Sequence, residues 1–251
     1  SRNSNYICSL IEKYKVELLP TTPSFLNMLL LSGSHKKYDL SSLKIISYGA
    51  EPMPASTLSL VNKSFSHIKL QQTYGMIEIG VLRSKSKSND SLWVKLGGEG
   101  YKLRIVDGIL QIKTDSALLG YIGAKSPFTE DGYFITGDSV EQDGEWIKIL
   151  GRKSELINVG GEKVYPTEIE TIILENKKIL DVVVYGSKNL LLGQIVNAKI
   201  VINNQYKDNF DISNFKKECA QNMSKYMVPG KIIIVDEIEK SDRGKKLRQF
   251  D

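Results

Sequence analysis

The hydrophobic and polar positions of the N-terminal third follow two alternating periods. Short apolar runs of strand length end on glycine or polar residues, and segments with apolar residues at helical spacing, such as Phe25, Met28 and Leu29, lie between them. Repeated strand–loop–helix units predict an α/β sheet with parallel strands and covering helices. The expected strands cover 16–22, 43–49 and 67–75, and the expected helices cover 9–14, 23–33 and 55–65.

The pattern changes near Arg83. A polar, low-complexity loop over 84–90 is followed by short strand-like runs separated by turn residues. Asp107-Gly108 and Asp143-Gly144 stand between apolar runs and predict tight hairpins. We therefore expect a small, mostly β subdomain over 83–150.

A further unit is expected from Gly151 onward. Strand and helix patterns alternate there, and the helix predicted over 166–176 has proline in its first turn and glutamates near its N-terminus. The expected fold class is α/β, with a first domain over 1–150, whose sheet portion is 1–82, and a compact α+β domain over 151–251.

Composition narrows the class of protein. Of the 251 residues, 41% are hydrophobic and 25% are charged, which is typical of a soluble globular protein. No apolar run reaches the roughly 20 residues of a membrane helix, and the polar start is unlike a signal peptide. Cys8 and Cys219 are too few for a disulfide framework, so we expect a cytoplasmic protein.

The net charge of +5 is concentrated at the C-terminus. Five cations and one aspartate lie between Lys240 and Arg248, a local charge of +4, and the rest of the chain is nearly neutral. No broad basic face is implied, so nucleic acid is not an expected partner. A basic run of this kind is most often a solvated tail.

Four strand ends stop on glycine beside polar residues. They are YGAEP (48–52), TYGMIE (73–78), ITGDS (135–139) and LGRKSE (150–155). Glycine after a strand lets the backbone approach a ligand, and sheets of this class bind ligands at the carboxyl ends of their strands. One such stretch is weak evidence for a site, whereas all four in this order predict one.

These stretches resemble the motifs of the adenylate-forming superfamily, which includes acyl-CoA synthetases, nonribosomal-peptide adenylation domains and luciferases. GRKSELINVGGEKVYPTEIE (151–170) resembles its hinge motif, and SDRGKKLR (241–248) resembles its C-terminal Gly-Lys motif. The resemblance implies an AMP-forming acid–thiol ligase. Such an enzyme uses ATP and Mg²⁺ to activate a small carboxylic acid as an acyl-adenylate, then forms a thioester with coenzyme A or with the phosphopantetheine of a carrier protein.

The resemblance assigns three charged residues to the chemistry. Attack of a carboxylate on the α-phosphate of ATP builds negative charge that a metal ion and a positioned cation stabilise. By resemblance Glu78 holds Mg²⁺ and Lys245 is the catalytic cation. Asp138 accepts hydrogen bonds from the ribose hydroxyls, which an ionised carboxylate does well.

The remaining nucleotide contacts come by resemblance from two further segments. Tyr74 stacks on the adenine, and the backbone of Gly49, Ala50 and Glu51 covers its other face. Arg152 adds a contact to the ribose or a phosphate.

The hinge motif implies that the small domain is mobile. Its pivot is Ser154, where the family usually has Asp or Lys. Gly160, Gly161 and Lys163 then line the tunnel for the thiol, since paired glycines admit a thin pantetheine arm.

The acyl pocket implied by resemblance is small and aliphatic, which favours an apolar acyl or aryl group. Its residues are Ser47, Ala50, Thr73, Val81 and Leu82.

Two departures from the family pattern leave alternatives open. Ile77 replaces a threonine that contacts the α-phosphate, and nothing matches the Ser/Thr/Gly-rich phosphate loop. We therefore expect the C-terminal portion of a longer enzyme, not fully active by itself. One alternative is an adenylation domain that serves a carrier protein, and another is a catalytically impaired adenylate-binding or interaction module.

Overall fold

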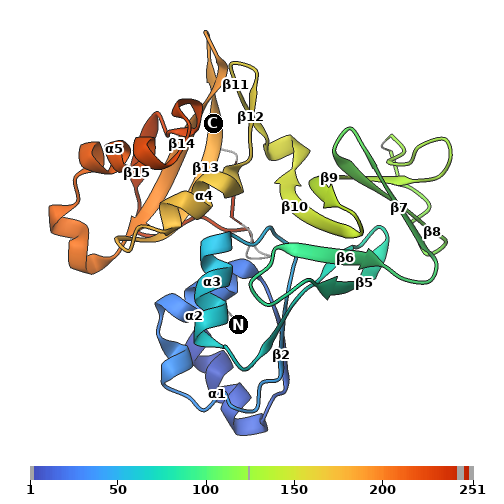
Figure 1. Ribbon diagram of the computed structural model, residues 1–251, viewed down its shortest axis with the longest axis horizontal. Helices are drawn as coiled ribbons and strands as arrows, with labels where there is room; N and C mark the ends of the chain where they lie inside the picture. The colour runs from blue at the N-terminus through green and yellow to red at the C-terminus, as the bar shows by residue number, and fades with distance from the viewer. Residues whose placement is uncertain (1–2, 124, 242–245, 249–251) are drawn as a thin grey trace.

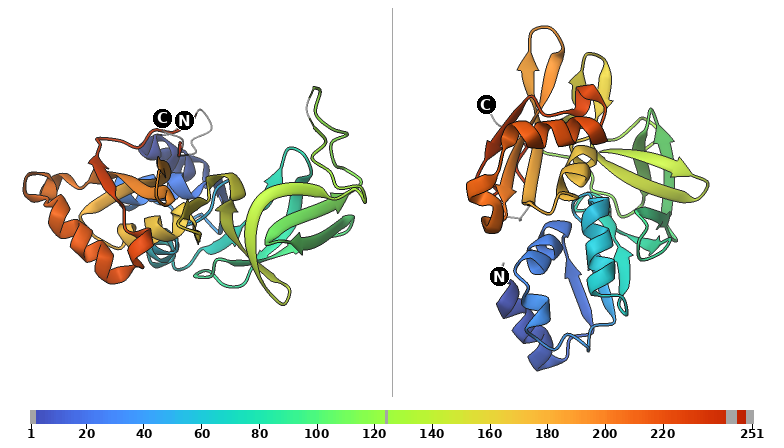
Figure 2. Two further views of the ribbon diagram at one scale, coloured as in Figure 1. Left: turned by 90° about the horizontal axis from the view of Figure 1, so that it is seen from above. Right: turned by 60° about the vertical axis from the view of Figure 1, so that its left-hand side comes forward.

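Three β-sheets follow one another along the chain (Figure 1). The computed structural model describes residues 3–123, 125–241 and 246–248. The right-hand view of Figure 2 shows the C-terminal unit above the N-terminal helices, with the second sheet to one side of both. This order of an α/β unit, a β unit and an α+β unit confirms the expected fold class.

The first sheet is parallel, with strand order β1-β2-β3 and helices in the connections. Leu26, Ile46 and Leu58 pack in its core. The strands β2 and β3 run in register from Ile45↔Lys69 to Tyr48↔Gln72, so both end at the same edge. The elements are α1 (Ser4–Tyr14), β1 (Leu18–Thr21), α2 (Pro23–Leu31), η1 (Ser34–Lys36), β2 (Ile45–Tyr48), α3 (Ala55–Ser64) and β3 (Lys69–Gln72).

Helix α2 begins where the proline pattern predicts. Thr22 caps it, because its hydroxyl accepts the Phe25 N–H at 3.2 Å, and Pro23 occupies the first turn, where no N–H is needed. The Glu51 carboxylate accepts the Ser24 N–H at 2.7 Å and so satisfies a second free donor of this helix end.

The second sheet has seven antiparallel strands in the order β4-β5-β6-β10-β9-β8-β7. Asp107 and Gly108 have φ of +50° and +73° between β7 and β8, which is the conformation that a two-residue hairpin requires. The hairpin at Asp107-Gly108 is therefore confirmed, and a hairpin also joins β9 to β10, with Gly144 and Glu145 as its turn. The strands are β4 (Tyr74–Met76), β5 (Gly80–Ser86), β6 (Trp93–Gly97), β7 (Tyr101–Val106), β8 (Ile109–Thr114), β9 (Phe134–Asp143) and β10 (Trp146–Arg152).

The second sheet begins about ten residues before the expected boundary at Arg83. Residues 84–86, expected in a polar loop, extend β5 and pair with β6. An antiparallel sheet tolerates a hydrated face, so these polar side chains need no burial. The Ser86 hydroxyl also accepts the Gln72 N–H at 2.8 Å, which joins this sheet to the first one.

The C-terminal unit contains a five-stranded sheet, ordered β12-β11-β14-β13 with β15 parallel to β14. Ile169, Val182 and Ile200 are completely buried in its core. Asn27 of α2 donates to the Leu180 carbonyl at 3.3 Å and links this unit to the first. The elements are η2 (Lys153–Glu155), β11 (Ile157–Val159), β12 (Glu162–Val164), α4 (Pro166–Leu174), β13 (Ile179–Asn189), β14 (Gly193–Ile202), η3 (Asn204–Asn209), α5 (Ile212–Asn222), η4 (Lys225–Met227) and β15 (Lys231–Ile234).

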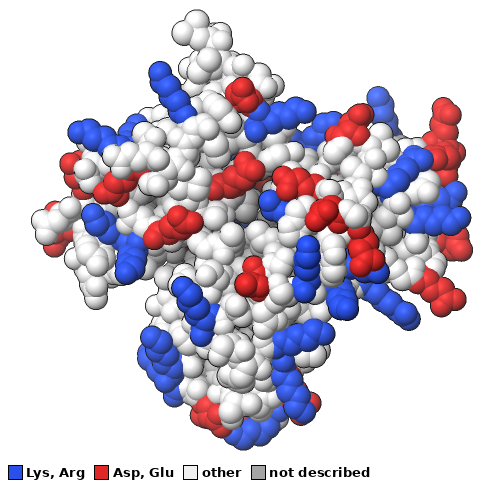
Figure 3. Space-filling model, viewed as in Figure 1, with Lys and Arg blue, Asp and Glu red and all other residues white. Residues whose placement is uncertain are grey.

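The surface has mixed charge. On the face shown in Figure 3, cationic and anionic side chains are interspersed over all three units. Within the described ranges no helix combines the length and the apolar character that crossing a membrane requires.

Candidate active site

A cleft of 530 Å³ lies where the three units meet. Its walls come from the loop after β2, the segment around β4, strands β9 and β10, and the C-terminal tail. The structure thus brings all four glycine-terminated stretches of the sequence to one place. Strand ends of a parallel sheet are where such folds bind ligands.

Gly49 allows two walls of the cleft to touch. A Cβ at this position would lie 2.6 Å from the Thr73 hydroxyl and 2.7 Å from the Thr73 carbonyl oxygen, which no side chain tolerates. Ala50 follows with φ of +69°, in the left-handed region. The loop after β2 is therefore pressed against the end of β3, and its backbone lines the cleft. The Glu51 side chain, by contrast, is bonded to the first turn of α2.

Asp138 is a nearly buried polar group of the cleft. Its side chain is only 11% exposed, and its two carboxylate oxygens have different partners: the Tyr74 hydroxyl donates to one at 2.6 Å and Arg152 Nε lies 2.8 Å from the other. The Arg152 guanidinium also donates to the Thr136 carbonyl at 2.8 Å. A carboxylate has about four acceptor positions, so a group of this kind is suited to accept from several donors at once.

Tyr74 is a neutral donor in this arrangement. Burial raises the pKa of its hydroxyl, and the negative charge of Asp138 raises the pKa further. The ring is 8% exposed and lines the cleft. Stacking of Tyr74 on an adenine remains a prediction, as does the ribose role of Asp138.

Glu78 lies in the turn between β4 and β5, on the rim of the cleft. The Tyr121 hydroxyl donates to its carboxylate at 2.7 Å, and this hydrogen bond lowers the pKa of Glu78 below its usual value. Its carboxylate is thus ionised at neutral pH.

The chemistry of Glu78 fits a magnesium ion that the nucleotide shares. Mg²⁺ is usually held by one or two carboxylates, with waters and substrate phosphates as further ligands. In the described part of the chain no three His, Cys, Asp or Glu side chains converge as a metal cage. Glu78 is therefore suited to a site that the substrate phosphates complete.

The C-terminal tail reaches the cleft. Lys245 itself lies outside the described residues, but Lys246 and Arg248 line the cleft. Their side chains are 10% and 13% exposed, and both are ion-paired to carboxylates of the C-terminal unit. The expectation of a solvated basic tail is therefore wrong for these two residues, because acidic partners compensate for their burial.

The hinge and tunnel residues are not among those that line the cleft. Ser154 is exposed in the η2 turn, directly after β10. Gly160 and Gly161 form the turn of the β11–β12 hairpin with φ of +60° and +98°, and Lys163 follows in β12. None of these four residues lines the cleft as described. Their predicted roles concern a different orientation of the C-terminal unit.

Only some residues of the predicted acyl pocket line the cleft. Ala50 and Thr73 line the cleft, whereas Ser47, Val81 and Leu82 do not. Leu82 belongs to the buried core of the second sheet. Ile77 lines the cleft and is 86% exposed, so its apolar side chain is open to solvent there.

Several cleft residues were not among the predicted ones, including Lys246, Arg248 and Tyr121. Lys246 and Arg248 belong to the Gly-Lys motif. Their position beside Lys245 in the sequence could have marked them as residues of the site. Tyr121 lies in an irregular segment, and no pattern in the sequence marks it.

Comparison with known proteins identifies the family. The AMP-binding enzyme family matches residues 1–134, and the AMP-binding enzyme C-terminal domain matches residues 168–245. The chain therefore belongs to the AMP-binding enzymes, which confirms the resemblance to adenylate-forming enzymes.

Two curated relatives are CoA ligases. 4-Coumarate–CoA ligase 1 of Glycine max is 29% identical over 270 residues, covering 98% of this chain and 92% of that protein. 2-Succinylbenzoate–CoA ligase of Listeria monocytogenes is 31% identical over 252 residues, covering 95% of this chain and 51% of that protein. The chain spans about half the length of most curated relatives that it matches.

The arrangement of the units resembles that of a solved ligand complex. ATP-bound MatB from Rhodopseudomonas palustris is 25% identical and superposes with a TM-score of 0.82, covering 97% of this chain and 51% of that one. The apo form of MatB, covering 98% of this chain and 52% of its own, gives a TM-score of 0.66.

Asp138→Ala is expected to weaken binding of a non-hydrolysable acyl-adenylate analogue strongly. Each charge-assisted hydrogen bond to a ribose hydroxyl is worth roughly 1.5–3 kcal/mol before water compensates. Calorimetry measures the affinity, and circular dichroism checks folding. Asp131→Asn is the control, because Asp131 pairs with Arg104 on the same sheet and outside the cleft. An unchanged affinity would remove Asp138 from the site.

Proposed function

We propose that the protein containing this chain activates a carboxylic acid with ATP and transfers the acyl group to the thiol of coenzyme A. The observation that carries this proposal is Asp138. It is a nearly buried carboxylate held by Tyr74 and Arg152 in a cleft that also receives the cationic tail. A site for an adenylate needs an acceptor for ribose beside a source of positive charge for the phosphate.

In the first half-reaction, an oxygen of the substrate carboxylate attacks the α-phosphorus of ATP. The new O–P bond forms the acyl-adenylate while the bond to pyrophosphate breaks. The backbone of the loop after β2 and the Tyr74 ring bind the adenine, and Asp138 orients the ribose. This positioning brings the carboxylate and the phosphorus into line, which lowers the entropic cost of their encounter.

Charge neutralisation is the remaining requirement of this step. Glu78 would hold Mg²⁺, which reduces the negative charge on the phosphates when it is bound. Lys245 would supply a second positive charge to the reacting oxygens. Arg152 lies beside Asp138 and would contact the ribose or the α-phosphate.

In the second half-reaction, a thiolate attacks the acyl carbonyl carbon and AMP leaves. The CoA ligases among the relatives favour free coenzyme A as the acceptor, and an assay with a phosphopantetheine carrier protein tests the alternative. The hairpin with Gly160, Gly161 and Lys163 would reach the cleft after rotation of the C-terminal unit about Ser154. The higher TM-score to ATP-bound MatB supports the view that this structure has the adenylating orientation.

The proposed acid is small and has an apolar acyl or aryl group. Ala50, Thr73 and the exposed Ile77 side chain present a small, largely apolar surface to the cleft. The names of 4-coumarate and 2-succinylbenzoate ligases are consistent with an aryl acid.

The 251-residue chain is expected to bind a non-hydrolysable acyl-adenylate analogue at least about tenfold more tightly than ATP, a difference of ~1.4 kcal/mol. The cleft holds the residues proposed to contact adenine and ribose, whereas the sequence has no match to the loop that binds the outer phosphates. Calorimetry with each ligand at the same magnesium concentration measures the ratio. Tighter binding of ATP would contradict the expectation.

Lys245→Ala, made in the complete enzyme, is expected to separate the two half-reactions. It should slow pyrophosphate release strongly, because the lysine acts on the first transition state, yet leave thioester formation from supplied acyl-adenylate near the wild-type rate. Both rates are measured side by side. Equal loss in both steps would mean that the lysine is structural or is used throughout.

Ile77→Thr is expected to raise kcat/KM for ATP in the complete enzyme by roughly two- to tenfold, the effect of one added hydrogen bond of about 0.5–1.5 kcal/mol. The position is 86% exposed, so the change costs little stability. Ile77→Val is the matched control without a hydroxyl. No gain with threonine would show that another group already makes this contact.

A further inference from the structure

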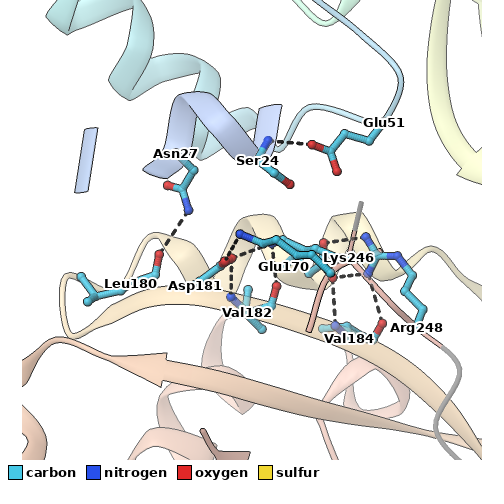
Figure 4. A network of polar contacts seen from close by, with 11 residues as sticks. Ser24, Asn27, Glu51, Glu170, Leu180, Asp181, Val182, Val184, Lys246 and Arg248 are labelled. Atoms are coloured by element: carbon cyan, nitrogen blue, oxygen red, sulfur yellow. Dashed lines mark hydrogen bonds and ion pairs between the residues drawn. The ribbon is translucent and has the colours of Figure 1, made fainter. Parts of the chain in front are cut away.

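One buried carboxylate, that of Asp181, holds the tail on the C-terminal unit. We call its contacts with Lys246 and Lys240 the clamp. Lys246 Nζ lies 2.7 Å from one oxygen of Asp181, and Lys240 Nζ lies 3.6 Å from the other. The Lys246 ammonium also donates to the Val182 carbonyl at 2.7 Å. Figure 4 shows Lys246 lying along the start of β13 beside Arg248. Two lysines on either side of Lys245 thus share a single anchor.

The backbone reinforces this anchor. Lys240 and Lys246 form an antiparallel bridge, and the Leu247 N–H donates to the Glu239 carbonyl at 3.0 Å. The chain is therefore held on both sides of Lys245 by main-chain and side-chain contacts. Fixing both ends of a short segment restricts the positions that its residues can reach.

Both partners of the pair are charged despite their burial. Burial alone would raise the pKa of Asp181, but the positive charges of Lys246 and Lys240 outweigh it and hold the pKa below its usual value. Burial alone would lower the pKa of Lys246, and the nearby carboxylates reverse this shift. A buried pair of this kind is costly to break, because one uncompensated charge remains.

The clamp occupies the side chain of Lys246, so this lysine has an anchoring role that differs from the catalytic role proposed for Lys245. Lys246 lines the cleft, yet two of the three donor positions of its ammonium are taken by Asp181 and Val182. Asp181 does not line the cleft, and its ion pairs with Lys240 and Lys246 connect it to the tail that does. The neighbouring Leu180 carbonyl accepts from Asn27, so the anchor lies beside a contact between the two units.

We propose that Asp181 is a positioning residue for adenylation, which fixes the described part of the tail at the cleft through Lys246 and Lys240. This inference rests on the proposed function. Lys246 is the residue through which the anchor acts, and its ammonium stays on Asp181 during the first half-reaction.

Hydrogen exchange of the 251-residue chain tests the clamp without any activity. Asp181→Asn is expected to speed exchange of peptides spanning residues 239–248 by about tenfold or more, a change of ~1.4 kcal/mol. Exchange of α5 should stay as in the wild type. Asp236→Asn is the matched control, since it removes the same charge from an exposed pair with Lys207.

Two further variants keep this test decisive. Lys246→Met removes the cation while keeping the length of the side chain, and it should loosen the same peptides even if Asp181→Asn folds poorly. The double variant should be no looser than Asp181→Asn, because the two residues act through each other. Unchanged exchange of residues 239–248 in both single variants would overturn the clamp.

The half-reactions of the complete enzyme test the positioning role. Asp181→Asn should slow pyrophosphate release about tenfold or more and change thioester formation from supplied acyl-adenylate less than about twofold, where tenfold corresponds to ~1.4 kcal/mol. Asp181→Glu should recover part of the first rate. Equal loss in both steps would overturn the positioning role. A wild-type enzyme that releases no pyrophosphate with any acid would refute the proposed function instead, while the exchange result still decides the clamp.

Discussion

The buried carboxylate of Asp138 is the interaction on which the site depends. Removing a carboxylate from water is costly unless charged and hydrogen-bonded partners surround it. Tyr74 at the start of β4 and Arg152 at the end of β10 supply those partners. Their contacts tie three strands of the second sheet together at the cleft. They also fix the place where the chain leaves this sheet, because Arg152 is the last residue of β10.

A second ion-pair network lies on the other side of the η2 turn. Arg248 pairs with Glu155 at 3.0 Å and also with the buried Glu170 of α4. Every member of this network belongs to the C-terminal unit, whereas Asp138 and Arg152 belong to the second sheet. A rotation about Ser154 would therefore break neither network. The turn is short and exposed, and the strong electrostatic contacts lie within the units that would move as rigid bodies.

The sequence predicted the parts of the fold that depend on local chemistry. Pro23 and the Asp107-Gly108 turn are where the pattern placed a helix start and a hairpin, because each residue type favours one backbone conformation. The polar residues 84–86 carry no such signal, and they form a strand only because β6 pairs with them. The same reason explains why the site was predicted only in part. Asp138 and Arg152 stand in recognisable stretches, whereas Tyr121 reaches Glu78 from 43 residues away, a contact that no local pattern specifies.

The contact between the C-terminal unit and the first one combines a hydrogen bond with packing of α3 against α4. The Asn27 hydrogen bond to the Leu180 carbonyl crosses the interface, and a neutral bond of this kind is worth about 0.5–1.5 kcal/mol. The buried pairs of Asp181 and Glu170 stay inside the C-terminal unit, so they give the tail a fixed place without binding that unit permanently to the first sheet. A ligand that contacts both units can then select one orientation with a modest difference in binding energy. In this view the clamp keeps the tail in register with its own unit, while a ligand bound between the units selects the position of that unit on the cleft.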